Sequence, residues 1–484
     1  MDKKIFQNAI FKSLLNVCNI IIPIIIGPYV LRILDRQYYD TFNGLNATFQ
    51  FFLVFGGFGI YVYGVREISR IRDDIAACNR FFTEMFLLGC IANAVAFVAY
   101  LGFALWGTKS QLETVLALIL TIQFLSNVFN VEWLNEANEN YSFIAIKSIV
   151  VKVAYLVGIF LLVRHADDIL WYTLLLVLSA VLNSLASFVY IRKKYRFSWR
   201  GIRLGKYLSP LLQIFVISNV MLMYAQLDKL MLRIFVNDAS VTAYQISQYI
   251  SSILYNLLVS FVTVAIPRVS NLWANGQTEV GRQLHQNVTN TFYMLFVPVC
   301  MGLTLLSKEV VVIYGGEQYL DCAVALALYG IVQLVSSVHY ILGESFLYIA
   351  GKESSLLKIN IVGAVVNGVL NVILVACGWF TANTAIVTVI IAYGVVGYLD
   401  WRFVKKQLGY CYPLFNRHVV VYLGAALTFI PVVLAVKAVL DNVLLVSAVS
   451  FALCVAAYGL VLYVCKDSAF MEYAGKIRNV IKKR

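Results

Sequence analysis

Long apolar segments alternate with short polar ones along the whole chain. Each apolar run reaches about eighteen residues or more, which is enough for a helix to cross a hydrocarbon core about 30 Å thick. A single segment in a bilayer must satisfy its own backbone hydrogen bonds, so each run is predicted to be a helix. We predict fourteen spans, at residues 10–34, 41–65, 82–106, 112–134, 142–163, 168–191, 210–235, 241–266, 289–313, 322–349, 356–378, 383–404, 418–438 and 442–465.

The amino-acid composition supports an all-α integral membrane protein. Of the 484 residues, 61% are hydrophobic and 13% are charged, whereas soluble domains carry about 25% charged residues. The nine cysteines are scattered through apolar segments without the spacing of a metal or redox site, so we interpret them as small core residues. A water-soluble fold is excluded because it could not bury this much apolar surface.

The basic residues predict the orientation of the chain. The formal net charge is +13, but Lys and Arg occur in short clusters between apolar runs, where they flank a membrane and do not indicate nucleic-acid binding. Most lie in the N-terminal segment and in alternate loops, above all at 192–206. Both termini and this linker are therefore predicted to be cytoplasmic. The apolar stretch after Lys12 is too long for a signal peptide, so we expect it to be retained as the first span.

Two pairs of similar short segments suggest that the two halves of the chain are related by an internal repeat. Residues 31–34 end the first span with Leu-Arg-Ile-Leu, and residues 232–235 end the seventh with Leu-Arg-Ile-Phe. Residues 137–142 and 350–355 form a weaker pair before spans five and eleven. A parallel repeat would give two lobes, a central cavity and alternating access. The predicted parts are an N-terminal six-helix lobe at 1–192, a basic cytoplasmic linker at 193–209, a C-terminal six-helix lobe at 210–404, two additional transmembrane helices at 418–465 and a basic cytoplasmic tail at 466–484.

The motifs of the common catalysts are missing from the sequence. There is no phosphate-binding G-x-x-x-x-G-K-[ST] loop and no H-E-x-x-H zinc motif. We therefore expect no catalytic residues, metal or cofactor, and the protein is not predicted to be an enzyme.

Ionisable residues inside the predicted spans mark candidate functional positions, since a charge there is costly unless it faces a cavity or a partner. Lys152 is about ten residues from either end of span five, so its charge reaches the interface poorly and we expect it to line the cavity. For Lys147, Glu132 and Glu344, pairing between helices or an extended side chain at the interface is an equally good explanation. The other residues of this kind are Asp228, Lys229 and His339.

Neutral polar residues gather on single helix faces. At 100° per residue, Tyr244, Gln248, Ser251 and Tyr255 share one face of span eight, and aromatic rings beside amides and hydroxyls suit sugars. Similar faces occur in spans eleven and one, where small and amide residues also hold membrane helices together. Their members are Asn360, Gly363, Asn367 and Asn371, and Asn16, Asn19, Pro23 and Gly27.

Several short patterns recur in order along most of the chain. They lie at residues 28–34, 59–68, 132–141, 227–232, 266–270 and 314–319. In this order they resemble a known family, the polysaccharide repeat-unit flippases of the O-antigen type, within the multidrug/oligosaccharidyl-lipid/polysaccharide exporter superfamily. The sequence departs from the family's usual pattern at Arg233, where glycine is common.

The resemblance implies a V-shaped bundle with spans thirteen and fourteen packed outside the two lobes. It further implies transfer of an undecaprenyl-diphosphate-linked oligosaccharide from the cytoplasmic to the outer leaflet of the bacterial inner membrane. Expected partners are this substrate, membrane lipids and the glycan polymerase machinery. The predicted substrate-binding residues are Arg32, Lys147, Lys152, Lys229, Arg233, Tyr244, Gln248 and Tyr255. The candidates for cation coupling are Glu132, Asp228, His339 and Glu344.

The energetics of such a cargo are consistent with transport without ATP. A diphosphate with about two negative charges gains roughly 4 to 5 kcal/mol on moving outward across a potential of about 100 mV that is negative inside. Two other classes stay open. A multidrug or organic-cation antiporter of the same superfamily should favour an acidic cavity, and a membrane-bound sugar polymerase or ligase should carry a large external catalytic loop. Other transporters, including a lipid II flippase, are further alternatives.

Overall fold

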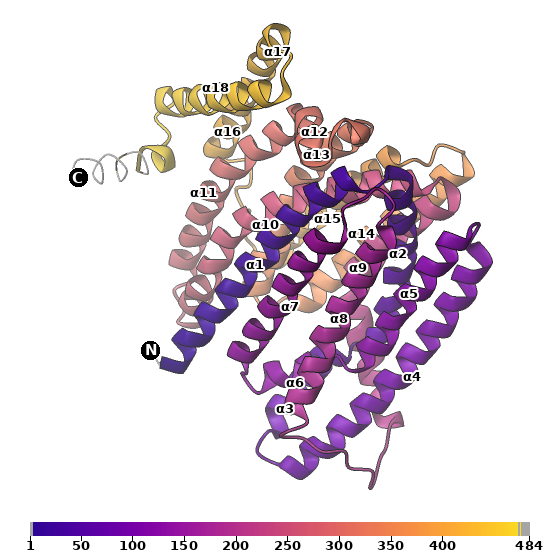
Figure 1. Ribbon diagram of the computed structural model, residues 1–484. Coiled ribbons are helices and arrows are strands. Elements are labelled where there is room, and N and C mark those ends of the chain that lie inside the picture. Colours follow the sequence, from indigo (N-terminus) through magenta and orange to yellow (C-terminus); the bar gives the residue numbers. More distant parts are fainter. Residues whose placement is uncertain (1–2, 473–474, 476–484) are drawn as a thin grey trace. The chain divides into compact units, whose positions relative to one another are not determined.

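The computed structural model describes residues 3–472 and residue 475, without the side chains of residues 3–10, 12, 217 and 220–224. All the elements of this part of the chain are helices (Figure 1). Contacts divide the chain into two compact units, Met1–Thr242 and Ala243–Arg484, which are described separately below as unit 1 and unit 2. The division into lobes at 1–192 and 210–404 stays a prediction, and most of the tail predicted at 466–484 lies outside the described residues.

Unit 1 contains nine helices and the start of a tenth, counted over its described residues. They are α1 (Lys3–Ile33), α2 (Arg36–Gly57), α3 (Ile60–Ile71), α4 (Ile75–Gly107), α5 (Gln111–Val128), α6 (Glu132–Ala137), α7 (Tyr141–Leu162), α8 (Ile169–Ile191), α9 (Gly205–Phe235) and α10 (Asp238–Ala274). Asp35 caps the N-terminus of α2, because its Oδ1 accepts hydrogen bonds from the backbone N–H groups of Gln37 and Tyr38.

Unit 2 holds the rest of α10 and the helices that follow it. These are α11 (Thr278–Leu305), α12 (Ser307–Gly315), η1 (Glu317–Tyr319), α13 (Cys322–His339), η2 (Tyr340–Leu347), α14 (Glu353–Ala376), α15 (Ala382–Gln407), α16 (Arg417–Leu427), α17 (Phe429–Val439) and α18 (Val443–Val464). The η2 segment is a π-helix that continues α13. A capping box of Thr381 and Thr384 starts α15.

The predicted all-α membrane architecture is confirmed. Within the described residues, 13 helical segments are long and apolar enough to cross a membrane, and α9 covers the remaining predicted range of 210–235. Valines such as Val95, Val98 and Val150 point outward and are more than half exposed. Such apolar outer faces suit hydrocarbon and not water, so the chain is a multi-pass membrane protein.

Several predicted boundaries are wrong, because uniform apolarity conceals changes of backbone direction. The predicted span 41–65 is two helices, broken where Phe58 and Gly59 adopt left-handed backbone angles. A side chain at Gly59 would also collide with the α9 backbone, since its Cβ would lie 2.9 Å from Leu211 O. The predicted spans 112–134 and 418–438 are likewise interrupted, whereas 322–349 is continuous and changes from α-helix to π-helix at Tyr340. The span predicted at 289–313 starts at Thr278 and ends at Leu305.

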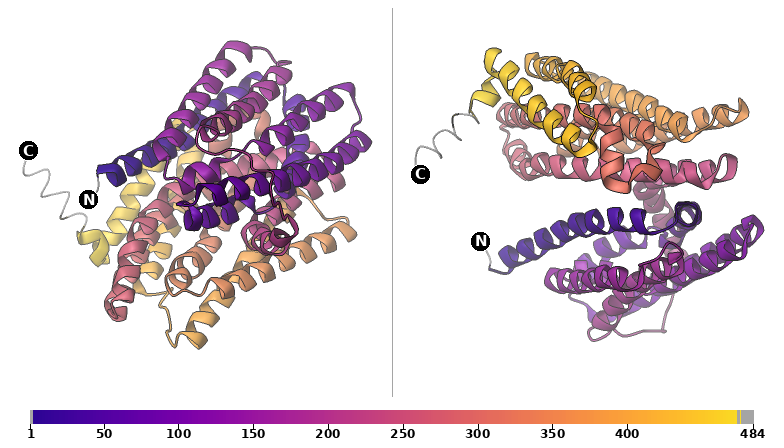
Figure 2. Two further views of the ribbon diagram at one scale, coloured as in Figure 1. Left: turned by 90° about the horizontal axis from the view of Figure 1, so that it is seen from below. Right: turned by 45° about the horizontal axis from the view of Figure 1, so that its top comes forward.

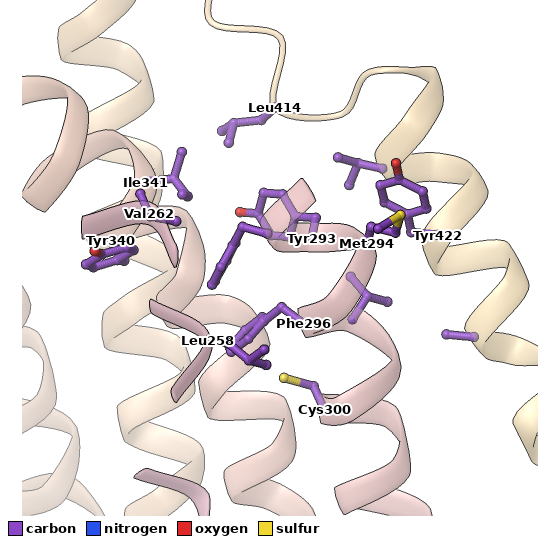
Figure 3. Packing of buried hydrophobic residues seen from close by; sticks show 14 of the residues in the cluster. Leu258, Val262, Tyr293, Met294, Phe296, Cys300, Tyr340, Ile341, Leu414 and Tyr422 are labelled. Carbon is purple, nitrogen blue, oxygen red and sulfur yellow. The ribbon is translucent and has the colours of Figure 1, made fainter. Parts of the chain in front are cut away.

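Packing inside each unit brings distant segments together. In unit 1, α2 packs on α4, α5 and α9, while α7 packs on α1 and α8. In unit 2, α13 packs on α11 and α15, and α17 packs on α18 (Figures 1 and 2). The core of unit 2 is rich in aromatic residues, and Figure 3 shows Tyr293 and Phe296 near the middle of the residues drawn, with Tyr340 at their edge. The polar side chains described next are fixed by these helix pairs.

Candidate functional site

Lys147 of α7 is held in a buried polar network in unit 1. Its Nζ lies 2.6 Å from Glu132 Oε2 and 2.7 Å from Ser187 Oγ. It also donates to the backbone carbonyl of Asn183 at 3.3 Å. The network joins α6, α7 and α8, and the carboxylate of Glu132 neutralises the lysine. A role of Lys147 or Glu132 in binding substrate or coupling cations stays a prediction.

Lys152 lies on another side of the same helix. Five residues separate it from Lys147, which at 3.6 residues per turn rotates it by roughly 140°. Its side chain is half-buried, and among the described residues it has no hydrogen bond or ion pair. An ammonium group in this position has lost part of its hydration without gaining a counter-ion, which leaves it able to bind an anion.

The end of α9 carries a second group of charges in unit 1. Arg233 Nε lies 3.7 Å from Asp238 Oδ1 at the start of α10. Gly44 of α2 permits this approach, because a Cβ there would lie 1.8 Å from the same carboxylate oxygen. Nearby on α9, Asp228 and Lys229 are both buried. The predicted substrate-binding residue Arg32 is exposed at the end of α1.

The predicted polar face of α10 in unit 2 is mostly packed against other rings. The ring centroid of Tyr244 is 5.5 Å from that of Tyr329, and the centroid of Tyr255 is 5.9 Å from that of Phe296. Ser251 accepts a hydrogen bond from Gln333 at 3.0 Å. Gln248 is partly buried. Their contact with a sugar stays a prediction.

His339 is the centre of a charged cluster in unit 2. Its Nδ1 is 2.7 Å from Asp400 Oδ2 on α15, and its Nε2 is 3.8 Å from Glu344 Oε1 on η2. The side chains of His339 and Asp400 are 3% and 0% exposed, whereas that of Glu344 is 49% exposed. Sequence reasoning missed Asp400, because it lies near the end of the predicted span 383–404, where a charge is ordinary.

Two amides and a hydroxyl form a closed buried ring in unit 2. Asn367 Nδ2 donates to Thr388 Oγ1 at 3.1 Å, Thr388 Oγ1 donates to Asn371 Oδ1 at 2.7 Å, and Asn371 Nδ2 donates to Asn367 Oδ1 at 3.3 Å. The sequence predicted the shared face of the two asparagines. It did not predict Thr388, since nothing in the spacing connects α14 to α15. The ring holds these two helices together.

A small cavity of about 70 Å³, lined mostly by apolar side chains, lies in unit 1 beside the break between α2 and α3. Its walls include Tyr61 and two linked amides, in which Asn127 Nδ2 donates to Asn93 Oδ1 at 2.9 Å. Asn93 also donates to the carbonyl of Gly56 at 3.0 Å, so it satisfies a backbone group that the break leaves free. Sequence reasoning missed this cavity because its polar groups are neutral and far apart along the chain.

Ionisable side chains inside apolar membrane-spanning helices, such as Lys147, Lys152 and His339, are typical of multi-pass membrane transport proteins. The particular family follows from the model of the polysaccharide biosynthesis protein family, which matches residues 5–273. That match covers more than half of the chain, and the protein therefore belongs to this family. It is a transport protein and not an enzyme, and the resemblance found in the sequence is confirmed.

Two relatives extend the comparison. A protein of Haloferax volcanii, provisionally named a low-salt glycan biosynthesis flippase, is 24% identical over 197 residues. This match covers 39% of the present chain and only 41% of that relative. A protein of Shigella dysenteriae, provisionally named an O-antigen transporter, is 21% identical over 371 residues, or 75% of this chain and 90% of the relative.

Solved structures share the fold. The lipid II flippase MurJ, in an inward closed conformation, superposes with a TM-score of 0.76 at 13% identity, covering 94% of this chain and 98% of that one. The MATE transporter VcmN of Vibrio cholerae superposes with a TM-score of 0.54 at 11% identity, covering 86% and 98%. These likenesses establish the architecture and leave the cargo open.

Proposed function

We propose that this protein translocates an undecaprenyl-diphosphate-linked oligosaccharide repeat unit from the cytoplasmic to the outer leaflet of the bacterial inner membrane by alternating access. Membership of the polysaccharide biosynthesis family supports the proposal. So do the names of the two relatives, a glycan biosynthesis flippase and an O-antigen transporter. Both termini are proposed to be cytoplasmic, as the distribution of basic residues predicts.

The observation that carries the proposal is the half-buried ammonium group of Lys152, which has no hydrogen bond or ion pair among the described residues. The barrier to flipping is the loss of water from phosphates and sugar hydroxyls in the bilayer. A lysine near the middle of α7 replaces that water with a charge-assisted contact to a phosphate oxygen. An antiporter of organic cations would gain nothing from a positive charge in this place, because like charges repel.

The test is complementation of a strain that lacks the gene. The strain should lose surface glycan and accumulate the lipid-linked repeat unit on the cytoplasmic side, and the wild-type gene should restore export. Lys152→Ala should restore little or no export at wild-type abundance, whereas Lys152→Arg should restore part of it because the charge is retained.

A matched control separates charge at this place from charge in general. Lys352, which is exposed between η2 and α14, should tolerate replacement by alanine. Full export by an abundant Lys152→Ala protein would remove Lys152 from the site. A deletion strain with normal surface glycan but raised drug sensitivity would overturn the proposed function in favour of the antiporter.

A further inference from the structure

The segment 192–206, between α8 and α9, is strongly basic. Seven of its fifteen residues are Lys or Arg, and none is Asp or Glu. It leaves α8 at the end of unit 1 where α3 and α6 also lie (Figure 1). A run of like charges is often a mobile, solvated stretch of chain, so the contacts of this one decide whether it forms a binding surface.

Side chains of α4 hold the backbone of the segment in place. Asn79 Oδ1 accepts a hydrogen bond from the N–H group of Arg196 at 2.7 Å. One turn further along α4, Thr83 Oγ1 accepts a hydrogen bond from the N–H group of Ser198 at 2.8 Å. These bonds use the backbone of the segment and leave its basic side chains unused. The segment is therefore an ordered part of unit 1.

Glu84 of α4 fixes the end of the segment. Its side chain is only 1% exposed. Oε1 accepts a hydrogen bond from the N–H group of Arg203 at 2.9 Å, and Oε2 accepts one from the hydroxyl of Tyr207 at 2.7 Å. Lys206 Nζ lies 3.6 Å from Oε2. Among the described residues, this is the one ion pair that the segment makes, so most of its positive charge is not neutralised by the protein.

Aromatic rings anchor the middle of the segment. Alternate side chains of an extended chain point in opposite directions, and Tyr195 and Phe197 point inward. Tyr195 is buried, and Phe197 stacks on Phe82 with 5.1 Å between the ring centroids. Trp199 follows Phe197 and is 63% exposed. Tryptophan is enriched where a protein surface meets the interface between membrane and water.

The basic side chains of the segment fall into two sets. Three are held by acceptors of the protein, namely Arg192, Lys194 and Lys206. The other four are exposed and have no ion pair or side-chain hydrogen bond within the part of the chain that the structure describes, and these are Lys193, Arg196, Arg200 and Arg203. Because the backbone beneath them is already fixed, less conformational entropy is lost when they bind an anion.

We propose that the segment 192–206 is a docking surface for anionic phospholipid headgroups of the adjacent leaflet, which is the cytoplasmic leaflet in the proposed orientation. The free guanidinium groups bind phosphate oxygens through paired hydrogen bonds, and Trp199 lies at the level of the headgroups. A lipid fits better than an acidic protein, because the segment joins two membrane helices and its charges therefore stay at the bilayer surface. The inference does not depend on the cargo.

Native mass spectrometry of the full-length protein in detergent measures lipid binding directly. The probe is phosphatidylglycerol, and phosphatidylcholine is the reference without net charge. Replacing Arg196, Arg200 and Arg203 together with Gln should weaken binding of the first phosphatidylglycerol by about tenfold or more. Binding of phosphatidylcholine should not change. Wild-type affinity for phosphatidylglycerol in this triple variant would overturn the docking surface.

Three arginines of the same unit provide the matched control. Arg66 and Arg70 are paired with Glu67, and Arg72 is paired with Glu139. Replacing these three arginines with Gln removes the same formal charge, but their charges are already compensated. Phosphatidylglycerol binding should therefore change by no more than about twofold. Equal losses in the two triple variants would show that net charge attracts the lipid, and would overturn the assignment to this segment.

A variant of α4 tests the fixed backbone without changing any charge. Asn79→Ala combined with Thr83→Val removes two acceptors that hold the segment. Affinity for phosphatidylglycerol should fall by about threefold or more, because more conformational entropy is then lost on binding. Unchanged affinity would show that the spacing of the charges is not set by α4, and would overturn the fixed surface.

Fluorescence locates the bound lipid. In proteoliposomes, brominated phosphatidylglycerol should quench the wild-type protein more than brominated phosphatidylcholine does, and Trp199→Phe should remove most of this difference. A difference that persists in Trp199→Phe would place the lipid elsewhere and contradict the proposal.

Two further results would assign the surface to another partner. Tighter binding of undecaprenyl phosphate than of phosphatidylglycerol, lost in the triple variant at Arg196, Arg200 and Arg203, would make it a site for the carrier lipid. Normal phosphatidylglycerol binding by this variant, together with lost glycan export at wild-type abundance, would make it a site for a partner protein. Either result overturns phospholipid docking.

Discussion

Lys147 and Glu132 form a buried ion pair that joins α7 to α6, with 2.6 Å between Nζ and Oε2. This ion pair distinguishes the two lysines of α7, because only one of them has a carboxylate partner. The charge of Lys147 is neutralised by Glu132. Lys152, which is half-buried, has no such partner among the described residues. The different roles predict different phenotypes when each lysine is replaced.

Replacing Lys147 with Met should lower protein abundance before it affects transport. The change leaves the Glu132 carboxylate without its counter-charge, at a cost of about 3 to 5 kcal/mol. The double variant Lys147→Met with Glu132→Gln should recover part of that loss. Abundance in membranes and thermal unfolding in detergent measure both effects. A stable Lys147→Met protein that fails to export would instead place Lys147 in the substrate site.

Gly44→Ala should destabilise unit 1 by about 1 to 3 kcal/mol, the usual cost of overpacking. Its new Cβ would lie 1.8 Å from Asp238 Oδ1 and would displace the carboxylate from Arg233. Gly102→Ala in α4 is the control, since nothing lies within 4 Å of that position and alanine is the better helix former. Thermal unfolding of the two variants should move in opposite directions, and equal stability would contradict the close approach.

Acid should weaken the attachment of the chain after α18. Burial raises the pKa of Asp467, but hydrogen bonds from His418 at 2.5 Å, from the backbone of Phe470 and from Tyr422 outweigh it and hold the pKa below its ordinary value. A depressed folded-state pKa stabilises the protein above the unfolded value of about 3.9, and this contribution is lost as the pH falls through the folded value.

Thermal unfolding between about pH 6 and pH 3 measures this loss. Asp467→Asn should be less stable than the wild type at pH 6 and should show a shallower decline toward pH 3. A wild-type curve parallel to that of the variant would show that Asp467 contributes no pH dependence.

Reporter fusions test the orientation on which the direction of transport depends. Fusions after Arg203 and after Lys466 should read cytoplasmic, because basic loops are retained on that side. A fusion near Gln318 should read external. A cytoplasmic signal at Gln318 would require a different number of spans between these points.

The sequence predicted the helices well, and their interruptions poorly. Apolar length alone located the membrane segments, because a bilayer imposes the same requirement on each of them. The break at Phe58 has a local signal in Gly56, Gly57 and Gly59 that apolar length alone does not use. The approach of α9 to Gly59 could not be predicted, because it depends on tertiary packing.

Candidate residues were predictable when a charge stood inside an apolar run, as with Lys147, Lys152 and His339. Their partners were not, because pairing is decided across helices distant in sequence. Asp400 is 61 positions from His339, and its place near a helix end gave no signal. Thr388 was missed for a similar reason, since a lone threonine in an apolar helix is unremarkable.

The π-helix at Tyr340–Leu347 also sets the phase of the chain that follows it. A π turn contains one residue more than an α turn, so the segment inserts a one-residue register shift between α13 and the loop to α14. Deleting one residue there should turn a π turn into an α turn and keep the following side chains in nearly the same direction, whereas a deletion in the middle of α13 would rotate them by about 100°. A single-residue deletion should consequently be tolerated better in this short stretch than in the α-helix that precedes it, although both are equally apolar.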